Sequence, residues 1–418
     1  MPTKNAPTIC SIDLGSEHIR VLVAEAHIDG PKLISSGHKP SLKISNGNIH
    51  DILLVGEQLL SAVKKAEEGV DGRLDMIYVT SSGNSFYTEL TDSNILVSNS
   101  DGEITVDDIK EVEELMLRKD IPANRLVVTL DVCRYLLDGG KAVQNPEGQI
   151  ALSLGAEGIM ICADQNYLSM ISKIIHDQLG YKIERLFPQA TVTPFGMTNC
   201  EDPSRSSLVI DYGRGTIDYT VIKGEIQYVR TLPIGLDRVC ADIAECFDVK
   251  SSESGRLLRA YNDIHDSDDM DSGFISLKAL PGIEGRKISV KSLGQVIEAR
   301  VLESLELIWS DIEAHGLTNS LNNVVICGGA SHLKFMKEMV EKVTGLGLSD
   351  VSFIPEMVLP EIRDDRAAWV ACVGALIKGN RDYYVRRSQG KEKISSQFKD
   401  ELSRIFGMVK ELKSHIQW

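Results

Sequence analysis

Two segments with one shared pattern, the first near the N-terminus and the second in the middle of the chain, constrain the fold most. In both, an apolar run leads into Asp-x-Gly, a small polar residue follows, and a second apolar run ends the segment. The segments are Cys10–Glu25 and Leu208–Lys223. Each pattern predicts a β-hairpin with a tight turn. Its repetition in the two halves of a 418-residue chain predicts two related lobes that face each other.

The chemistry of the two turns indicates a site for phosphate. Glycine lets the backbone approach an anion closely, and the amides of a tight turn point toward it. An aspartate at the end of the strand, Asp13 in the first segment and Asp211 in the second, can hold a hydrated Mg2+. One such turn alone is more typical of an ordinary hairpin. The two together predict a pair of loops that clamp the phosphates of a nucleotide.

A third glycine-rich turn supports this hypothesis. The predicted strand Asn323–Gly329 ends in two glycines, and Ala330 and Ser331 open a predicted helix. The N-terminus of such a helix can lie beside phosphates or ribose. A lone Gly-Gly is more typical of a routine strand-to-helix turn, so the motif gains its weight from the two hairpins.

Composition excludes several classes of protein. The net charge of −15 repels nucleic acid, so neither DNA nor RNA is expected as a partner. The sequence has no run of about 18 apolar residues that would predict a membrane-spanning helix, and Met1–Ala6 lacks the pattern of a secretory signal. The eight cysteines form no CxxC pair. This predicts reduced, buried thiols rather than zinc ligands or disulfides.

The segment from Ser82 to Ala163 differs in character from its surroundings. Short apolar runs, turn residues and one helical pattern, Val106–Lys119, are typical of a small α+β module. We therefore expect a module that interrupts the first lobe. Its predicted strands are Ile95–Val97, Leu126–Leu130 and Ile159–Cys162.

Taken together, the two loops and the glycine pair resemble the fold shared by actin, sugar kinases and heat-shock chaperones. Within that fold, several segments resemble the FtsA family of bacterial cell division proteins. In chain order these are Asn145–Gly148, Leu232–Val239 followed by Asp242–Ala244, Gln295–Arg300 and Ala371–Gly374, with Leu236 in place of a glycine. The resemblance runs from Ile9 to Asn380.

The resemblance implies an α/β, actin-like two-lobed ATPase fold with an inserted small α+β subdomain and a C-terminal amphipathic helix. The expected division of the chain is 1–82 and 164–206 for the first lobe, 83–163 for the inserted subdomain, 207–365 for the second lobe with a helical subdomain at 248–311, 366–383 for a closing helix of the first lobe, 384–395 for a linker, and 396–418 for the terminal helix.

The resemblance also implies which residues contact ATP and Mg2+. Asp13 and Asp211 are expected to hold the metal. The wider set expected to bind the nucleotide is Asp13, Gly15, Ser16, His18, Asp211, Gly213, Arg214, Gly215, Thr216, Glu253, Arg256, Gly328, Gly329 and Ala330. Glu253 and Arg256 resemble a family contact to ribose and adenine, but their spacing is as typical of a surface salt bridge.

Three positions depart from the family pattern. His18 stands where the family commonly has Lys, which removes a fixed positive charge. Arg214 replaces a glycine of the second loop and could either obstruct the nucleotide or supply the missing charge. Phe187 stands where filament-forming relatives often have Glu, so no carboxylate there can position a water. We therefore expect nucleotide binding with slow ATP hydrolysis at most.

The end of the chain is basic and amphipathic. From Arg381 to Trp418 there are nine Lys or Arg against five Asp or Glu. Apolar residues recur there at steps of three and four and predict a helix that lies in a membrane interface. The residues expected to face the membrane are Phe398, Leu402, Ile405, Phe406, Val409, Leu412, Ile416 and Trp418. A helix docked on its own domain, or paired as a short coiled coil, is the alternative.

The resemblance implies a polymerising adaptor at the cytoplasmic face of the bacterial inner membrane, at the division site. Its expected partners are the FtsZ C-terminal peptide near Arg300, further copies of itself in an actin-like filament, membrane lipids and other divisome proteins. One alternative is a pilus-assembly adaptor of the PilM type, which shares the fold but normally lacks a terminal membrane helix. Another is a sugar or carboxylate kinase, for which the sequence shows no convincing catalytic base.

Overall fold

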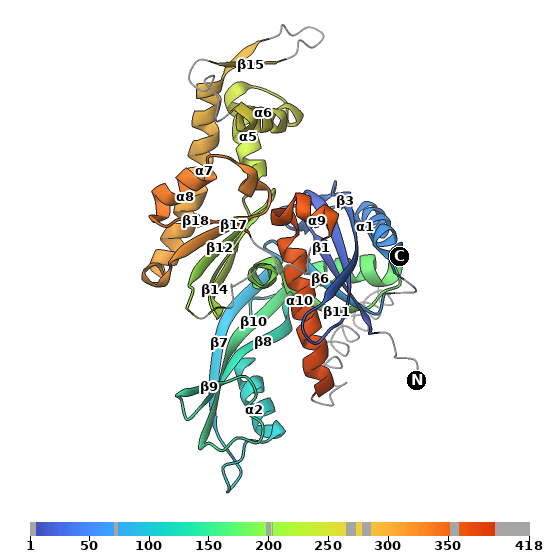
Figure 1. Ribbon diagram of the computed structural model, residues 1–418, viewed down its shortest axis with the longest axis vertical. Coiled ribbons are helices and arrows are strands. Elements are labelled where there is room, and N and C mark those ends of the chain that lie inside the picture. Colours follow the sequence, from blue (N-terminus) through green and yellow to red (C-terminus); the bar gives the residue numbers. More distant parts are fainter. Residues whose placement is uncertain are drawn as a thin grey trace, which may run out of the picture.

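Two five-stranded sheets with the same topology form the centre of the protein (Figure 1). The computed structural model describes residues 6–70, 74–197, 202, 204–264, 273–277, 286–351 and 359–388. In each sheet three consecutive strands pair antiparallel, and two later strands add in parallel beside the first of them. This repetition agrees with the two similar hairpins in the sequence.

The first sheet has the order β11-β6-β1-β2-β3, and the second has the order β14-β13-β12-β17-β18. The strands of the first are β1 Thr8–Leu14, β2 His18–Glu25, β3 Lys32–Pro40, β6 Met76–Ser81 and β11 Ile183–Pro188. Those of the second are β12 Ser207–Tyr212, β13 Ile217–Lys223, β14 Glu225–Leu232, β17 Asn323–Cys327 and β18 Leu348–Ser349. Every residue of β12 is buried, as is typical of a central strand covered on both faces.

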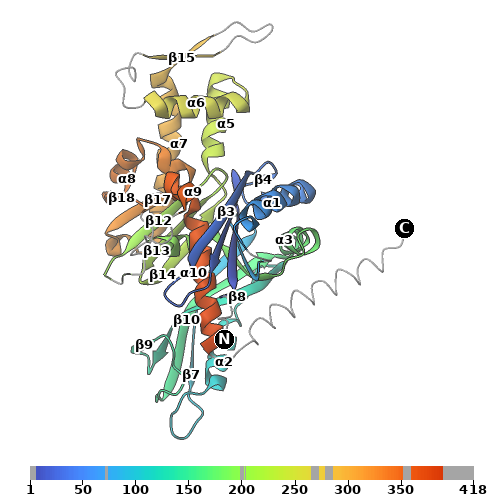
Figure 2. The ribbon, with the colours of Figure 1, turned by 45° about the vertical axis from the view of Figure 1, so that its right-hand side comes forward.

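Helices cover both sheets and create two apolar cores. Helices α1 (Ile52–Glu67) and α10 (Arg366–Ser388) pack on the first sheet, while α5 (Leu236–Phe247), α7 (Val290–Ala314) and α8 (Met336–Thr344) belong to the core of the second. Glycine sets the position of α10, because a Cβ on Gly374 would lie 1.9 Å from the carbonyl oxygen of Val192. Figure 2 shows α10 running from the junction of the two sheets toward the lower end of the molecule.

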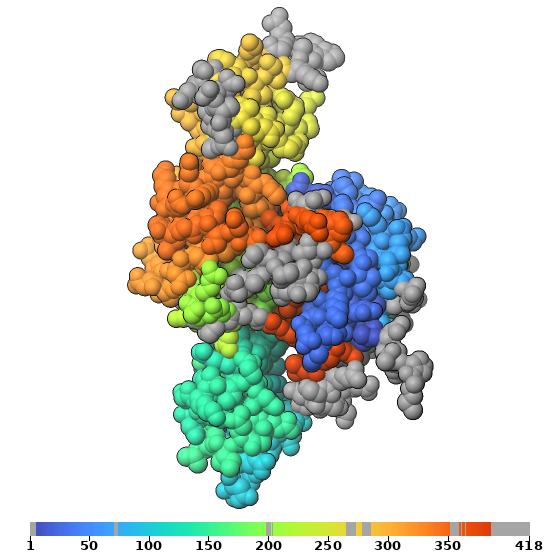
Figure 3. Space-filling model, viewed as in Figure 1, coloured from blue at the N-terminus to red at the C-terminus, as the bar shows by residue number. Residues whose placement is uncertain are grey.

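A separate module projects from the two sheets (Figure 3). It has a four-stranded sheet of order β7-β10-β8-β9, one helix and its own apolar cluster. Its elements are β7 Phe86–Leu96, α2 Val106–Met116, β8 Arg125–Leu137, β9 Lys141–Val143 and β10 Ser153–Asp164. Thr105 and Asp108 form a capping box at the start of α2. The strands are longer than the sequence pattern predicts, because most of β8 is only half-buried and shows no clear alternation.

Shorter elements complete the fold. These are β4 Ile44–Ser45, β5 Asn48–Ile49, α3 Gln165–Ser172 with a π-helical turn Lys173–Gln178, α4 Gln189–Val192 with a 3-10 turn Thr193–Gly196, α6 Ser251–Ile264, β15 Phe274–Ser276, β16 Lys287–Ser289, 3-10 turns Thr318–Ser320 and Gly329–His332, and α9 Pro360–Asp364.

Among the described residues, none of the helices has the length and apolar character needed to cross a membrane. The seven cysteines in this part of the chain are all free thiols. The predicted amphipathic helix at 396–418, with its membrane-facing residues, lies outside the described residues.

Candidate functional site

The turns of the two predicted hairpins meet at the junction of the sheets. A Cβ on Gly215 would lie 2.7 Å from the Oγ of Ser16 and 2.7 Å from the backbone nitrogen of Asn46. A Cβ on Gly15 would lie 2.7 Å from the carbonyl oxygen of His18. A larger residue at Gly215 would push the two loops apart, whereas one at Gly15 would clash within the first hairpin itself.

Three buried carboxyl groups lie behind these loops. Asp13 is the second-to-last residue of β1, Asp211 is the second-to-last residue of β12, and Asp218 lies opposite Asp211 across the β12–β13 hairpin. Burial raises the pKa of Asp13 to about 7, an effect that Arg20 opposes and the charge of Asp211 reinforces. Burial also raises the pKa of Asp211 to about 6, and burial together with the Asp211 charge raises that of Asp218 to about 7. The junction therefore concentrates negative charge that a bound cation would stabilise.

One oxygen of this cluster is available to a ligand. The Oδ1 of Asp13 is buried and has no hydrogen-bond partner among the described residues. Among all the residues that the structure describes, no three His, Cys, Asp or Glu side chains are grouped closely enough to hold a metal ion by themselves. A metal here would therefore need further oxygens from phosphate or water, as Mg2+ commonly has.

Arg20 is the fixed positive charge of the site, and the sequence reasoning missed it. It lies opposite Asp13 in the β1–β2 pair, with its Nη1 3.6 Å from Asp13 Oδ2. Its guanidinium lies 5.8 Å from the ring centroid of Trp369 on α10. The charge of Arg20 acts to lower the pKa of both Asp13 and Asp211. The hairpin register could have revealed it, because a tight turn at Gly15 places residues 13 and 20 side by side.

His18 carries no comparable charge. Burial, followed by the nearby Arg20, lowers the pKa of His18, so its imidazole is neutral at pH 7. Its ring meets the edge of His38, with the centroids 6.1 Å apart. The positive charge near the first loop is therefore on Arg20 rather than at position 18.

The side chain of Arg214 extends from the second loop to the first turn of α5. Its Nε lies 2.8 Å from Oδ1 of Asp237, in the first turn of α5, and its side chain is 49% exposed. The backbone carbonyls of Gly213 and Arg214 accept from the amides of Leu236 and Asp237, so the loop joins the start of this helix. Thr216 is buried at the start of β13.

The glycine pair after β17 lies against Asp211. Gly328 has φ +76°, and a Cβ there would lie 2.4 Å from Asp211 Oδ1. Its amide donates to the carbonyl of Ala367, which begins the long helix α10. Gly329 and Ala330 open a short 3-10 turn rather than the predicted helix, since α8 begins only at Met336. A Cβ on Gly329 would lie 3.9 Å from Glu17 Oε2 of the first loop. The structure thus brings all three predicted loops to one place.

Two polar side chains that sequence reasoning missed complete the carboxylate cluster. Gln189 follows β11, and its Nε2 donates to Oδ2 of Asp211 at 3.0 Å. Thr231 on β14 donates to Oδ1 of Asp218 at 2.5 Å. No local motif marks either residue, since each reaches the site through the arrangement of distant strands.

The structure places Glu253 and Arg256 in a salt bridge on α6. Arg256 Nε lies 2.8 Å from Glu253 Oε1, and its Nη2 donates to the carbonyl of Ser276 on β15 at 3.2 Å. Arg256 therefore connects α6 to β15, and these two elements lie close together at one end of the second lobe (Figure 1). A role of the two residues at the ribose or adenine stays a prediction.

Arg300, the predicted partner-binding residue, is on α7. Its guanidinium contacts Asp242 of α5 and Glu303 one turn further along its own helix. Leu307, two turns after Arg300, is 52% exposed. This part of α7 has a partly exposed arginine and, two turns further along, an exposed apolar side chain.

Comparisons with known proteins agree with this architecture. A family model described as "Cell division protein FtsA" matches residues 208–368, and one described as "SHS2 domain inserted in FTSA" matches residues 87–162. The Cell division protein FtsA of Bacillus subtilis (strain 168) is 22% identical over 334 residues, covering 80% of this chain and 76% of the relative. That of Streptococcus pneumoniae serotype 2 is 24% identical over 348 residues, covering 83% and 75%.

Solved structures share the fold. The PilM-PilN type IV pilus biogenesis complex contains a chain with a TM-score of 0.61 and 14% identity, covering 91% of this chain and 99% of that one. MreB 5 of Spiroplasma citri bound to AMPPNP has a TM-score of 0.55 and 12% identity, covering 93% and 100%. At such identities the likeness concerns the fold alone. The expected actin-like α/β fold with an inserted α+β subdomain is confirmed.

Proposed function

Because this chain belongs to the FtsA family of cell division proteins and has an actin-like fold, we propose that it binds ATP with Mg2+ between its two sheets and connects FtsZ to the inner membrane at the division site. In this role the protein assembles into actin-like filaments and works with other divisome proteins. It is an adaptor whose ATP hydrolysis is slow at most.

The observation that carries the nucleotide proposal is the meeting of both turns over buried carboxylates. Gly215 approaches Ser16 across the junction, and the Oδ1 of Asp13 lacks a partner among the described residues. Glycine turns let the backbone approach a phosphate closely, and an unsatisfied carboxylate oxygen suits a hydrated cation. Bound Mg2+ would offset the negative charge shared by Asp13, Asp211 and the phosphates. The solved relative MreB 5 of Spiroplasma citri is described as bound to AMPPNP, which supports a nucleotide at this fold.

Within this proposal, the residues of the chain have distinct tasks. Asp13 and Asp211 hold the hydrated metal, while Gly15, Ser16, Gly213, Gly215 and Thr216 receive the phosphates. Gly328, Gly329 and Ala330 receive the nucleoside, and Arg20 supplies positive charge. Phe187 offers no carboxylate to orient a water, and the nearby Gln189 is already bonded to Asp211. This supports slow hydrolysis.

The proposed FtsZ site is the outer surface of α7. Arg300 and the exposed Leu307 lie two turns apart on one side of this helix. An apolar residue of a short peptide would contact Leu307 there, and an acidic residue of the peptide would take the place of Asp242 or Glu303 beside Arg300. The proposed membrane anchor is the amphipathic pattern at 394–418, which is known from the sequence alone.

The test is recruitment of FtsZ to lipid. Vesicles of anionic phospholipid, sedimented with FtsZ, should carry FtsZ down only when this protein and ATP are present. FtsZ without its C-terminal peptide should stay in solution, and Arg300→Glu should reduce recruitment about tenfold or more, because it reverses the charge at the site. Equal sedimentation of FtsZ with and without this protein would contradict the adaptor role.

The likeness to PilM does not favour the pilus alternative. It rests on 14% identity and concerns the fold, whereas both matching family models describe FtsA.

A further inference from the structure

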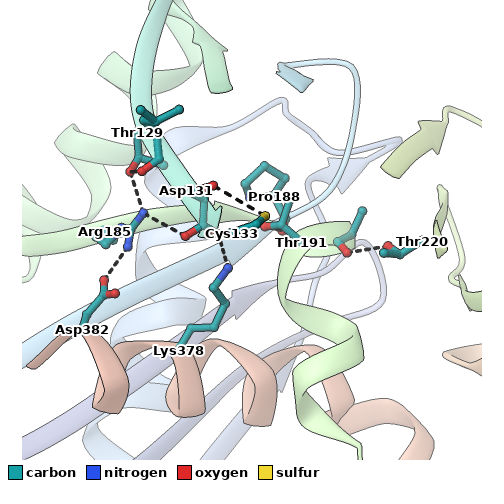
Figure 4. A network of polar contacts seen from close by, with 11 residues as sticks. Thr129, Asp131, Cys133, Arg185, Pro188, Thr191, Thr220, Lys378 and Asp382 are labelled. Atoms are coloured by element: carbon teal, nitrogen blue, oxygen red, sulfur yellow. Dashed lines mark hydrogen bonds and ion pairs between the residues drawn. The ribbon is translucent and has the colours of Figure 1, made fainter. Parts of the chain in front are cut away.

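A network of partly buried charges joins the inserted module to the first sheet and to helix α10 (Figure 4). Asp131, on β8 of the module, forms an ion pair with Lys378 of α10. Arg185 of β11 lies 3.9 Å from the other oxygen of Asp131. Arg185 also pairs with Asp382 of α10 at 2.6 Å and donates to the Oγ1 of Thr129 at 2.5 Å. Three elements, β8, β11 and α10, thus meet in one cluster.

The surroundings of this network keep its charges in place. The Arg185 guanidinium lies 5.0 Å from the centroid of Phe187, and Lys378 Nζ lies 4.8 Å from that of Phe195. Although burial acts to raise it, Lys378 and Arg185 hold the pKa of Asp131 below its usual value. A buried ion pair of this kind is costly to break from one side, because the remaining charge is left without a partner.

The same strand also contacts the second sheet. Arg134, three residues after Asp131, pairs with Glu157 of β10 at 2.6 Å. Its Nη1 lies 3.7 Å from Glu225, which begins β14 of the second sheet. Gln144, after β9, donates to the other oxygen of Glu225 at 3.4 Å. Asp131 and Arg134, which are three residues apart on β8, therefore join the module to both five-stranded sheets.

The first-sheet side of this connection continues to the candidate site. Arg185 and Gln189 belong to one short stretch, in which β11 runs directly into α4. Arg185 contacts Asp131 of the module, and Gln189 donates to Asp211 at the junction of the sheets. One continuous segment, Ile183–Val192, thus contacts the module near its start and the carboxylate cluster near its end.

We propose that β8 couples the position of the inserted module to the relative position of the two sheets. Asp131 holds the first sheet and Arg134 holds the second, so the sheets cannot move apart without either moving the module or breaking one contact. The module thereby responds to the state of the junction although it lies outside it. The coupling needs no bound nucleotide, and it can be tested on the free protein.

The test is hydrogen exchange on the full-length chain, with one contact broken at a time. Lys378→Met removes the first-sheet contact and leaves an apolar side chain beside Phe195. Glu225→Ala removes the second-sheet contact at a partly exposed position. Lys378→Met should speed amide exchange at the β13–β14 turn by about threefold or more. Because coupling is reciprocal, Glu225→Ala should speed amide exchange in β11 by a similar factor.

Lys119→Met is the matched control, because Lys119 pairs with Glu89 and donates to the carbonyl of Leu90, both on β7 inside the module. It should leave exchange in β11 and at the β13–β14 turn unchanged. If Lys378→Met fails to fold, the isosteric Asp131→Asn removes the same ion pair. The proposal is overturned if each variant speeds exchange only on its own side of β8, or if the control changes both sheets equally.

Discussion

Asp13 and Arg20 lie directly opposite each other on β1 and β2, with Arg20 Nη1 3.6 Å from Asp13 Oδ2. This ion pair occupies one oxygen of the carboxylate and leaves the other, Oδ1, without a partner among the described residues. The arrangement provides a positive charge beside the first loop and a buried carboxylate oxygen of the kind that suits a hydrated cation. His18 and Arg214, the two basic positions that the sequence pointed to, do not have this geometry.

Removing the charge of Arg20 should weaken ATP binding. Arg20→Met is expected to raise the Kd of ATP about tenfold or more, because an interaction of a charged group is lost in a buried site. Arg20→Lys, which keeps the charge, should lose less. The control is Arg214→Gly, whose side chain pairs with Asp237 and is half exposed; its effect should stay below about threefold. Calorimetry on the three variants decides, and a larger effect for Arg214→Gly would contradict this assignment.

Removing the carboxylate of Asp211 should weaken ATP binding when Mg2+ is present but not when Mg2+ is absent. Asp211→Ala is expected to raise the Kd of Mg-ATP more than tenfold, through loss of metal positioning. In excess chelator the same change should not weaken ATP binding, because it then removes a carboxylate that repels the phosphates. Unchanged affinity for Mg-ATP would show that the second loop does not bind the nucleotide as proposed.

Asp218 should make the free protein less stable at high pH. Its pKa is raised to about 7 by burial and by the charge of Asp211, whereas the pKa of an aspartate in an unfolded chain is about 3.9. A group with a raised folded pKa contributes stability that is complete below the unfolded value and is lost as the pH rises through the folded value.

The isosteric Asp218→Asn removes this titration. The free energy of unfolding should therefore fall less for the variant than for the wild type between about pH 5 and pH 8. Urea denaturation at both pH values measures this difference, with Asp92→Asn, at an exposed position, as the control. Equal losses in wild type and Asp218→Asn would contradict the raised pKa.

The C-terminal pattern predicts membrane binding led by apolar insertion. Each buried apolar side chain contributes roughly 1.5–3 kcal/mol before the cost of ordering the helix. Phe406→Glu should release the protein from anionic vesicles and leave ATP binding intact. Ser414→Glu adds the same charge on the opposite face of the predicted helix, so it should release much less.

Co-sedimentation and thermal melting, measured on the same proteins, separate membrane binding from a docked tail. A docked or coiled-coil tail predicts that Phe406→Glu lowers the Tm or breaks a dimer. It also predicts that the wild type does not sediment with vesicles.

The local parts of the site could be predicted from the sequence. The turns at Gly15 and Gly213 and the glycines after β17 have strong local patterns, and the structure brings them together. The contacts made by Gln189 and Trp369 could not be predicted, because they depend on how distant strands and α10 cross. The inserted module could be predicted because its short apolar runs and turn residues differ from the surrounding sequence. The length of β8 could not be predicted, because its half-buried faces give no clear alternation of apolar and polar residues.

The central claim is that the two similar loops hold a nucleotide with its metal. Titration calorimetry of the wild-type protein with ATP, in Mg2+ and then in excess chelator, tests it most directly. We predict a single binding event per chain whose Kd rises about tenfold or more when Mg2+ is removed, because the buried carboxylates then repel the phosphates. The absence of binding in both conditions, or binding of equal affinity with and without Mg2+, would contradict the account.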